Sequence, residues 1–244
     1  NYSAGKSIFM KWSYRIARIA GIDVKIHITF LLLLAYFGFA DWRDGGMFQG
    51  LLSMVFILLL FLCVLLHEFG HAMAGRHYGI RTPDITLLPI GGVARMQAIP
   101  DKPWQEFVIA VSGPAVNVAI AGTLWMVLSL FPGLLDQRHP VSSEILPNLM
   151  TINVALLVFN MIPAFPMDGG RVLRALLAMR LNYLKATKIA ARTGQVFAAG
   201  FVLVGLGWNP MLLFIGLFVF TAARQELDEV TFRQQIEQDG VYRI

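Results

Sequence analysis

The chain has 244 residues, of which 57% are hydrophobic and only 14% are charged. Soluble globular domains carry about 25% charged and about 45–50% apolar residues, so this composition excludes an ordinary soluble domain and favours a membrane protein. The net charge of +5 does not indicate a nucleic-acid-binding protein, because the basic residues lie between apolar runs and not on one basic face. With a single cysteine, Cys63, an intramolecular disulfide is excluded.

The apolar runs predict an all-α polytopic membrane protein. Residues 1–25 are expected to form a cytoplasmic or interfacial segment, and residues 26–223 a six-span membrane domain. The six spans are expected at about 26–40, 50–75, 105–131, 145–160, 190–207 and 210–223. Residues 224–244 are polar and are predicted to form a largely helical cytoplasmic tail.

The basic residues support this topology independently. Eighteen of the 20 Lys and Arg residues fall in alternate loops or at the two ends of the chain, and only Arg43 and Arg138 fall in the other loops. Cytoplasmic loops carry an excess of Lys and Arg. The sequence therefore predicts a cell-membrane protein with six spans and both termini in the cytoplasm.

The second apolar run ends in a metal-binding motif, His67-Glu68-Phe69-Gly70-His71. Residues four apart share one face of a helix, so His67 and His71 can bind one metal ion. Glu68 is then placed to act as a general base on a metal-activated water. Ionisable residues are costly in a membrane-spanning run, which favours a functional site over a structural accident.

A hydrolytic zinc site needs a third protein ligand and an open position for water. Asp168 is the best candidate, because prolines and glycines around it break the helical pattern and can bend its carboxylate inward. The alternative interpretation is that Asp168 caps a helix beginning near Gly169 or Gly170. The other potential ligands are better explained as interface, loop or core residues: His27, His77, His139 and Cys63.

Four patches of the sequence resemble the site-2 protease family of intramembrane zinc metalloproteases. They are His67–His71 (HEFGH), Leu88–Ala94 (LPIGGVA), Ser112–Asn117 (SGPAVN) and Asn160–Arg171 (NMIPAFPMDGGR). The resemblance implies one Zn²⁺ per chain, with Asp168 as the third ligand beside His67 and His71, and with Glu68 as the catalytic base.

The same resemblance suggests roles for three further residues. Asn160 is expected near the site, where its amide can bind substrate backbone or the developing oxyanion, or alternatively satisfy carbonyls of a broken helix. The patch that contains Gly91 and Gly92 resembles the family's membrane-associated β-hairpin, which is expected between helices two and three. The edge of that hairpin either pairs with an unwound substrate or is purely structural.

Together these features predict an intramembrane zinc metalloprotease that cuts a peptide bond in or near the transmembrane segment of a membrane protein. The resemblance implies single-span substrates, such as an anti-sigma factor or another membrane-tethered regulator. Because relatives often carry regulatory nucleotide-binding domains after the last span, the tail at 224–244 is a candidate stub of such a region. The alternative is a metal transporter or a non-catalytic metal-binding membrane protein.

Overall fold

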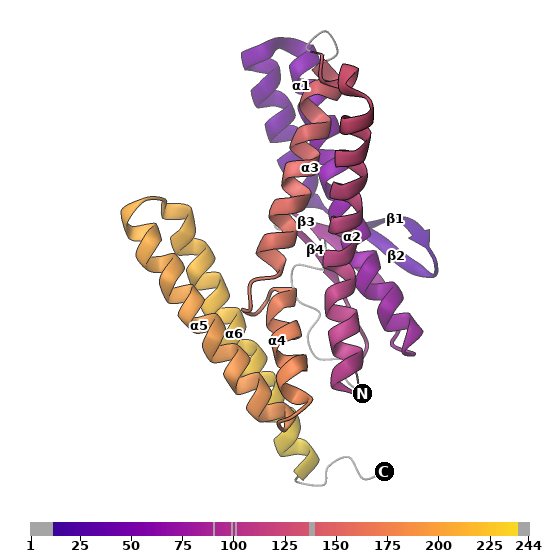
Figure 1. Cartoon of the computed structure of the whole chain (residues 1–244). Coiled ribbons are helices and arrows are strands. Elements are labelled where there is room, and N and C mark those ends of the chain that lie inside the picture. Colours follow the sequence, from indigo (N-terminus) through magenta and orange to yellow (C-terminus); the bar gives the residue numbers. More distant parts are fainter. Residues whose placement is uncertain (1–11, 90, 99, 101, 137–139, 239–244) are drawn as a thin grey trace. The chain divides into compact units, whose positions relative to one another are not determined.

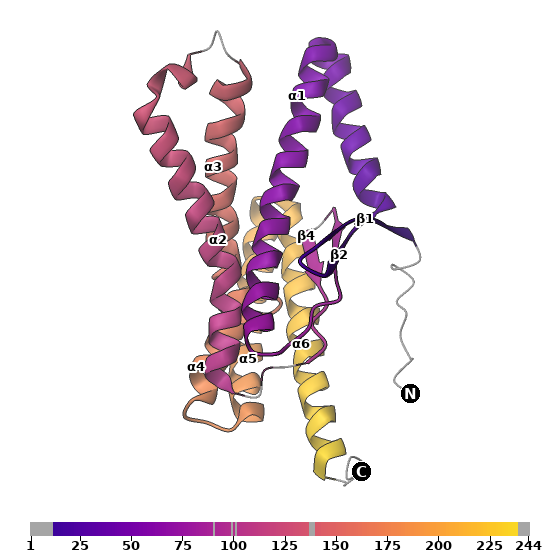
Figure 2. The same ribbon diagram turned by 90° about the vertical axis from the view of Figure 1, so that its right-hand side faces the viewer.

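The computed structural model describes residues 12–89, 91–98, 100, 102–136 and 140–238 (Figures 1 and 2). Its strands are β1 (Ser13–Ile19), β2 (Ile22–His27), β3 (Asp84–Leu88) and β4 (Gly91–Ala94). Its helices are α1 (Ile28–His77), α2 (Pro103–Leu130), the 3₁₀ helix η2 (Pro132–Leu135), α3 (Pro140–Asn160), α4 (Asp168–Ala178), α5 (Tyr183–Gly207) and α6 (Pro210–Gln238). His139 lies outside the described residues.

The chain divides into two compact units. The first unit comprises Asn1–Ile99 and Ala115–Leu156, and the second comprises Pro100–Pro114 and Leu157–Ile244. Within the described part of the chain, five helices are long and apolar enough to cross a membrane: α1, α2, α3, α5 and α6. The prediction of a multi-pass membrane protein is confirmed.

Helix α1 contains both of the first two predicted spans. Its two arms meet at Gly46, whose φ of 81° is not helical. The arms then run back along each other, since a Cβ on Gly38 would lie 2.7 Å from Met54 Cγ and a Cβ on Gly50 would lie 2.8 Å from Trp42 Cβ. Figure 2 shows this reversal at the top of α1. The two arms of α1 thus account for the two apolar runs at 26–40 and 50–75.

The first unit also contains a four-stranded sheet in the order β1-β2-β3-β4. The predicted hairpin is confirmed as the antiparallel pair β3–β4, whereas β1 and β2 are not predicted from the sequence. β2 runs antiparallel to β1 and parallel to β3. One face of the sheet packs against α1 through a buried apolar cluster that includes Val24, Ile85 and Phe61.

The second unit is built around α5 and α6, which lie side by side, with α4 packed against α5 (Figure 1). Its buried clusters centre on Ala164 and Val219 and on Phe165 and Ala190. Small residues on α5 let the segment before α4 lie close to the helix; a Cβ on Gly194 would be only 3.3 Å from Phe165 N.

Candidate active site

His67 and His71 lie one turn apart on the second arm of α1, and both are buried. Their Nε2 atoms are 3.1 Å apart. Two imidazole nitrogens that bind one zinc ion at about 2.0–2.1 Å in tetrahedral geometry are about 3.3 Å from each other. The pair therefore fits a single zinc ion, as the spacing of the motif predicts.

The orientation of His67 is fixed by Asn117 on α2. The Nδ1–H of His67 donates a hydrogen bond to Asn117 Oδ1 at 2.9 Å, and Asn117 is fully buried. Because Nδ1 carries the proton, the lone pair of His67 is on Nε2, the nitrogen that faces His71. Asn117 lies in one of the four patches that resemble the family, but the sequence alone predicts no role for it; the signal available was a polar side chain in an apolar span.

Glu68 lies against strand β4. A Cβ added to Gly92 would be 2.6 Å from Glu68 Cγ and 3.2 Å from Val64 Cγ1, so only glycine fits at this position without moving a neighbour. The backbone of β4 therefore lies directly over the side chain of the proposed base. This contact gives Gly92 a steric role in addition to the substrate-binding role that the sequence suggested.

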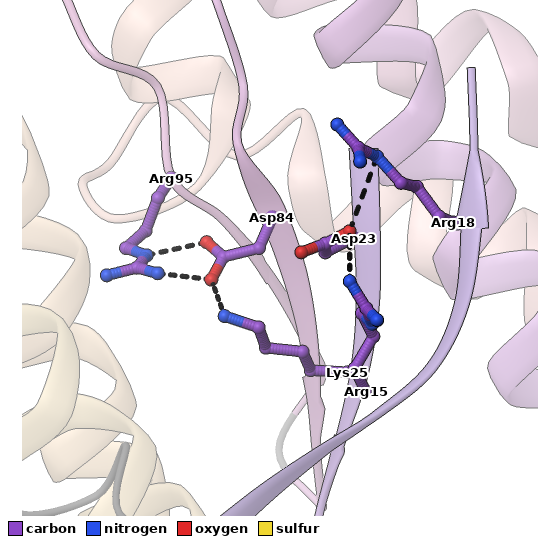
Figure 3. Close-up of polar contacts among 6 residues, drawn as sticks. All are labelled: Arg15, Arg18, Asp23, Lys25, Asp84 and Arg95. Atoms are coloured by element: carbon purple, nitrogen blue, oxygen red, sulfur yellow. Dashed lines mark hydrogen bonds and ion pairs between the residues drawn. The ribbon is translucent and has the colours of Figure 1, made fainter. Parts of the chain in front are cut away.

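The sheet that carries β4 is held together by a buried carboxylate, as Figure 3 shows. Asp84 on β3 accepts hydrogen bonds from Lys25 on β2 and from Nε and Nη2 of Arg95, the residue directly after β4. The distance from Arg95 Nε to Asp84 Oδ1 is 2.6 Å. Burial alone raises the pKa of Asp84, but the bonds from Arg95 and Lys25 outweigh burial and hold this pKa below its ordinary value. Asp84 thus stays ionised and ties three strands together.

Asp168 and Asn160 lie in the second unit, at the two ends of an irregular connection. Asn160 is the last residue of α3, and Asp168 is the buried first residue of α4. The N-cap of α4 is Met167, which makes no side-chain capping bond. The structure therefore does not place Asp168 at the N-cap position, which was the alternative to a role as a metal ligand.

The connection is compact because glycines allow the first turn of α4 to touch it. A Cβ on Gly169 would lie 2.3 Å from the carbonyl oxygen of Ile162, an impossible contact for any other residue. Backbone hydrogen bonds from Met167 N to Ala164 O at 2.9 Å and from Gly170 N to Met167 O at 3.1 Å complete the turn. The Pro- and Gly-rich sequence thus builds a tight corner that carries Asp168.

A buried ion cluster holds α4 within the second unit. Arg174, which is 3% exposed, donates to Glu106 Oε1 on α2 at 2.8 Å from Nε, and also bonds Glu226 on α6. Its guanidinium lies 4.9 Å from the ring centroid of Phe165 and 5.1 Å from that of Tyr183. A helix held at this point by charge pairs and aromatic rings has little freedom to shift, so the cluster fixes the helix that begins with Asp168.

Comparison with known proteins places these features in a family. The model of peptidase family M50 matches residues 55–140 and 137–201, more than half of the chain. This chain belongs to peptidase family M50. A solved structure, the site-2 protease from Methanocaldococcus jannaschii, aligns with a TM-score of 0.63 and 38% identity, over 88% of this chain and 95% of that one. The resemblance to site-2 proteases is confirmed.

Two curated relatives extend the comparison. The zinc metalloprotease MJ0392 of Methanocaldococcus jannaschii is 40% identical over 89% of this chain and 61% of its own length. The stage IV sporulation protein FB of Bacillus subtilis is 28% identical over 71% of this chain and 55% of its own length. The chain therefore spans about three fifths of the length of these relatives.

Proposed function

We propose that this protein is a zinc-dependent intramembrane endopeptidase. The observation that carries the proposal is the buried pair of imidazoles on a membrane-spanning helix, with Nε2 atoms 3.1 Å apart and with His67 oriented by Asn117. An M50 chain with such a pair has the arrangement expected of a metallopeptidase. The relatives named as zinc metalloproteases support the same metal.

His67, His71 and Asp168 would hold the zinc ion. The fit rests on donor chemistry, since two imidazoles and one carboxylate leave a fourth position open. The carboxylate of Asp168 lies in the first turn of α4.

When bound, zinc lowers the pKa of a coordinated water to about 7 and polarises a carbonyl group. Glu68 then accepts the proton of the attacking water and later delivers it to the leaving amine. Its carboxylate is positioned by the β4 backbone at Gly92, which restricts the side chain on that side. The amide of Asn160 would bind substrate backbone or the developing oxyanion.

Strand β4 would bind the substrate. A transmembrane helix keeps its amides hydrogen-bonded, so a substrate segment has to become extended before water can attack it. β4 is at the end of the sheet order and lies against Glu68, which supports pairing of an extended substrate with Gly91 and Gly92. The substrate class that fits is a single-span membrane protein, such as an anti-sigma factor or another membrane-tethered regulator.

We also propose where the protein lies in the cell and which side of the membrane its active site faces. The 18-to-2 distribution of basic residues supports a cell-membrane protein with both termini and the active site towards the cytoplasm. A metal transporter would instead need polar ligands on several spans, and the relative MJ0392 is named as a zinc metalloprotease.

The decisive experiment compares Glu68→Gln with the wild-type chain in liposomes, using a tagged single-span membrane protein as the probe. Glu68→Gln should keep its zinc content by elemental analysis and lose at least about 10²-fold in cleavage rate, the contribution of a general base. Glu144→Gln, which changes an exposed acid on α3, is the matched control and should cleave normally. Near-normal turnover by Glu68→Gln would contradict the proposed mechanism. Zinc flux into sealed liposomes without cleavage would favour the transporter.

A further inference from the structure

Strand β1 carries an uncovered set of large apolar side chains. Trp12, directly before the strand, is 56% exposed, and Tyr14, Ile16 and Ile19 are 60%, 58% and 49% exposed. Helix α1 packs against β2, β3 and β4, whereas β1 is the edge strand of the sheet. Within β1, only Ala17 packs against the apolar cluster between the sheet and α1. Isolated exposed apolar residues are common, but four on one short segment indicate a contact surface.

The register separates this strand into an apolar and a basic face. Tyr14 pairs with Ile26 and Ile19 with Ile22, so both lie on the face of the sheet that packs against α1. Arg15 and Arg18 lie on the opposite face, where both reach Asp23 at 3.6 Å (Figure 3). Their side chains remain 60% and 67% exposed, so they are available to further anionic groups.

The position of this strand along the membrane normal follows from chain connectivity. β2 ends at His27, which is the N-cap of α1, so the strand passes into the first membrane-spanning arm with no linker. Ser13 pairs with His27. Trp12 and Tyr14 therefore lie at the level where the first span begins, which is the level of the lipid headgroups.

We propose that β1 is an in-plane membrane anchor, with Trp12 and Tyr14 inserted at the boundary between headgroups and acyl chains, and with Arg15 and Arg18 bound to lipid phosphates. Trp and Tyr prefer this boundary because their rings are apolar and carry one polar group. Arginines on the other face complement anionic headgroups. The anchor sets the depth of the sheet, and through β2 and β3 the depth of β4. The proposal does not depend on protease activity.

The test uses the fluorescence of Trp12 in the full chain. The other four tryptophans, Trp42, Trp104, Trp125 and Trp208, are replaced by Phe, and the protein is reconstituted in vesicles of phosphatidylcholine and phosphatidylglycerol. Acyl chains brominated near the headgroup should reduce Trp12 emission more than chains brominated near the terminal methyl, and acrylamide in the water should reduce it little.

The matched control moves the tryptophan to the basic face of the same strand, as Arg18→Trp with Trp12→Phe. Its emission should respond less to the brominated lipids and more to acrylamide than that of Trp12. Strong acrylamide quenching of Trp12 with no effect of either brominated lipid would overturn the proposal. Protection from both reagents would also overturn it, because it would show that protein, such as a second copy of the chain paired along β1, covers the strand. A sharp thermal transition in each variant confirms that it is folded.

Discussion

Replacing Gly92 by alanine tests whether the close approach of β4 to Glu68 matters for catalysis. The added Cβ would lie 2.6 Å from Glu68 Cγ, whereas ordinary van der Waals contacts of this kind are 3.4–4 Å. Either the strand or the glutamate side chain therefore has to move by about 1 Å. A misplacement of this size can lower the rate of an enzyme about 10²-fold.

We expect Gly92→Ala to lower kcat about 10²-fold, since a displaced base is poorly aligned with the attacking water. Its zinc content should be unchanged because His67 and His71 are not touched. Alanine keeps the backbone N–H and C=O of β4, so pairing with an extended substrate remains possible and KM should change little. The assay is cleavage of a tagged single-span protein in liposomes, with zinc measured on the same samples.

Val93→Ala is the control for this variant. Val93 is the next residue of β4 and its side chain is 47% exposed, so its truncation changes the strand without touching Glu68. It should retain nearly full activity. If Gly92→Ala cleaves within twofold of the wild type, the steric role assigned to Gly92 is wrong.

Three further predictions concern the residues that support the site. Asn117→Ala removes the acceptor of the His67 Nδ1–H and should weaken zinc binding about 10–100-fold in a competition assay with a chelator, the usual cost of losing such a partner; unchanged affinity would show that Asn117 does not orient the ligand. Because the pKa of Asp84 is lowered in the folded protein, the stability that it contributes is present above its ordinary value of 3.8 and is lost as the pH falls through the lowered pKa. The melting temperature of Asp84→Asn should therefore depend less on pH in this acidic range, and a pH dependence identical to that of the wild type would contradict the ion cluster. Arg174→Ala leaves Glu106 buried without its charge partner and should destabilise the chain by about 3–5 kcal/mol in chemical unfolding, whereas a loss below about 1 kcal/mol would mean that water replaces the guanidinium.

The positions of the basic residues predict the membrane topology but not the contacts that these residues make. Counting them predicts topology, because charges avoid the membrane and favour its cytoplasmic side. The structure gives some of the same residues a second role. Lys25 and Arg95 bind Asp84, and Arg174 is buried between two glutamates. No count of charges predicts these pairs, since the partners of Arg174 lie 68 and 52 residues away.

Strands β1 and β2 were not foreseen because their sequence, SYRIARI followed by IDVKIH, mixes charged and apolar residues directly before a long apolar run. The strands become stable only through pairing with β3, about 60 residues later in the chain, and through packing against α1. Strand formation depends on such partners more than helix formation does.

The sequence alone determined the features that depend on local periodicity. Long apolar runs specify the membrane-spanning helices, and a four-residue spacing puts His67 and His71 on one face of a helix, because the geometry of a helix is the same wherever it occurs. Only the tertiary structure decided what surrounds these residues: Asn117 behind His67, and the β4 backbone over Glu68. These contacts join segments some 25 to 50 residues apart, and the way such segments pack is set by the shapes of many side chains together and not by any one motif.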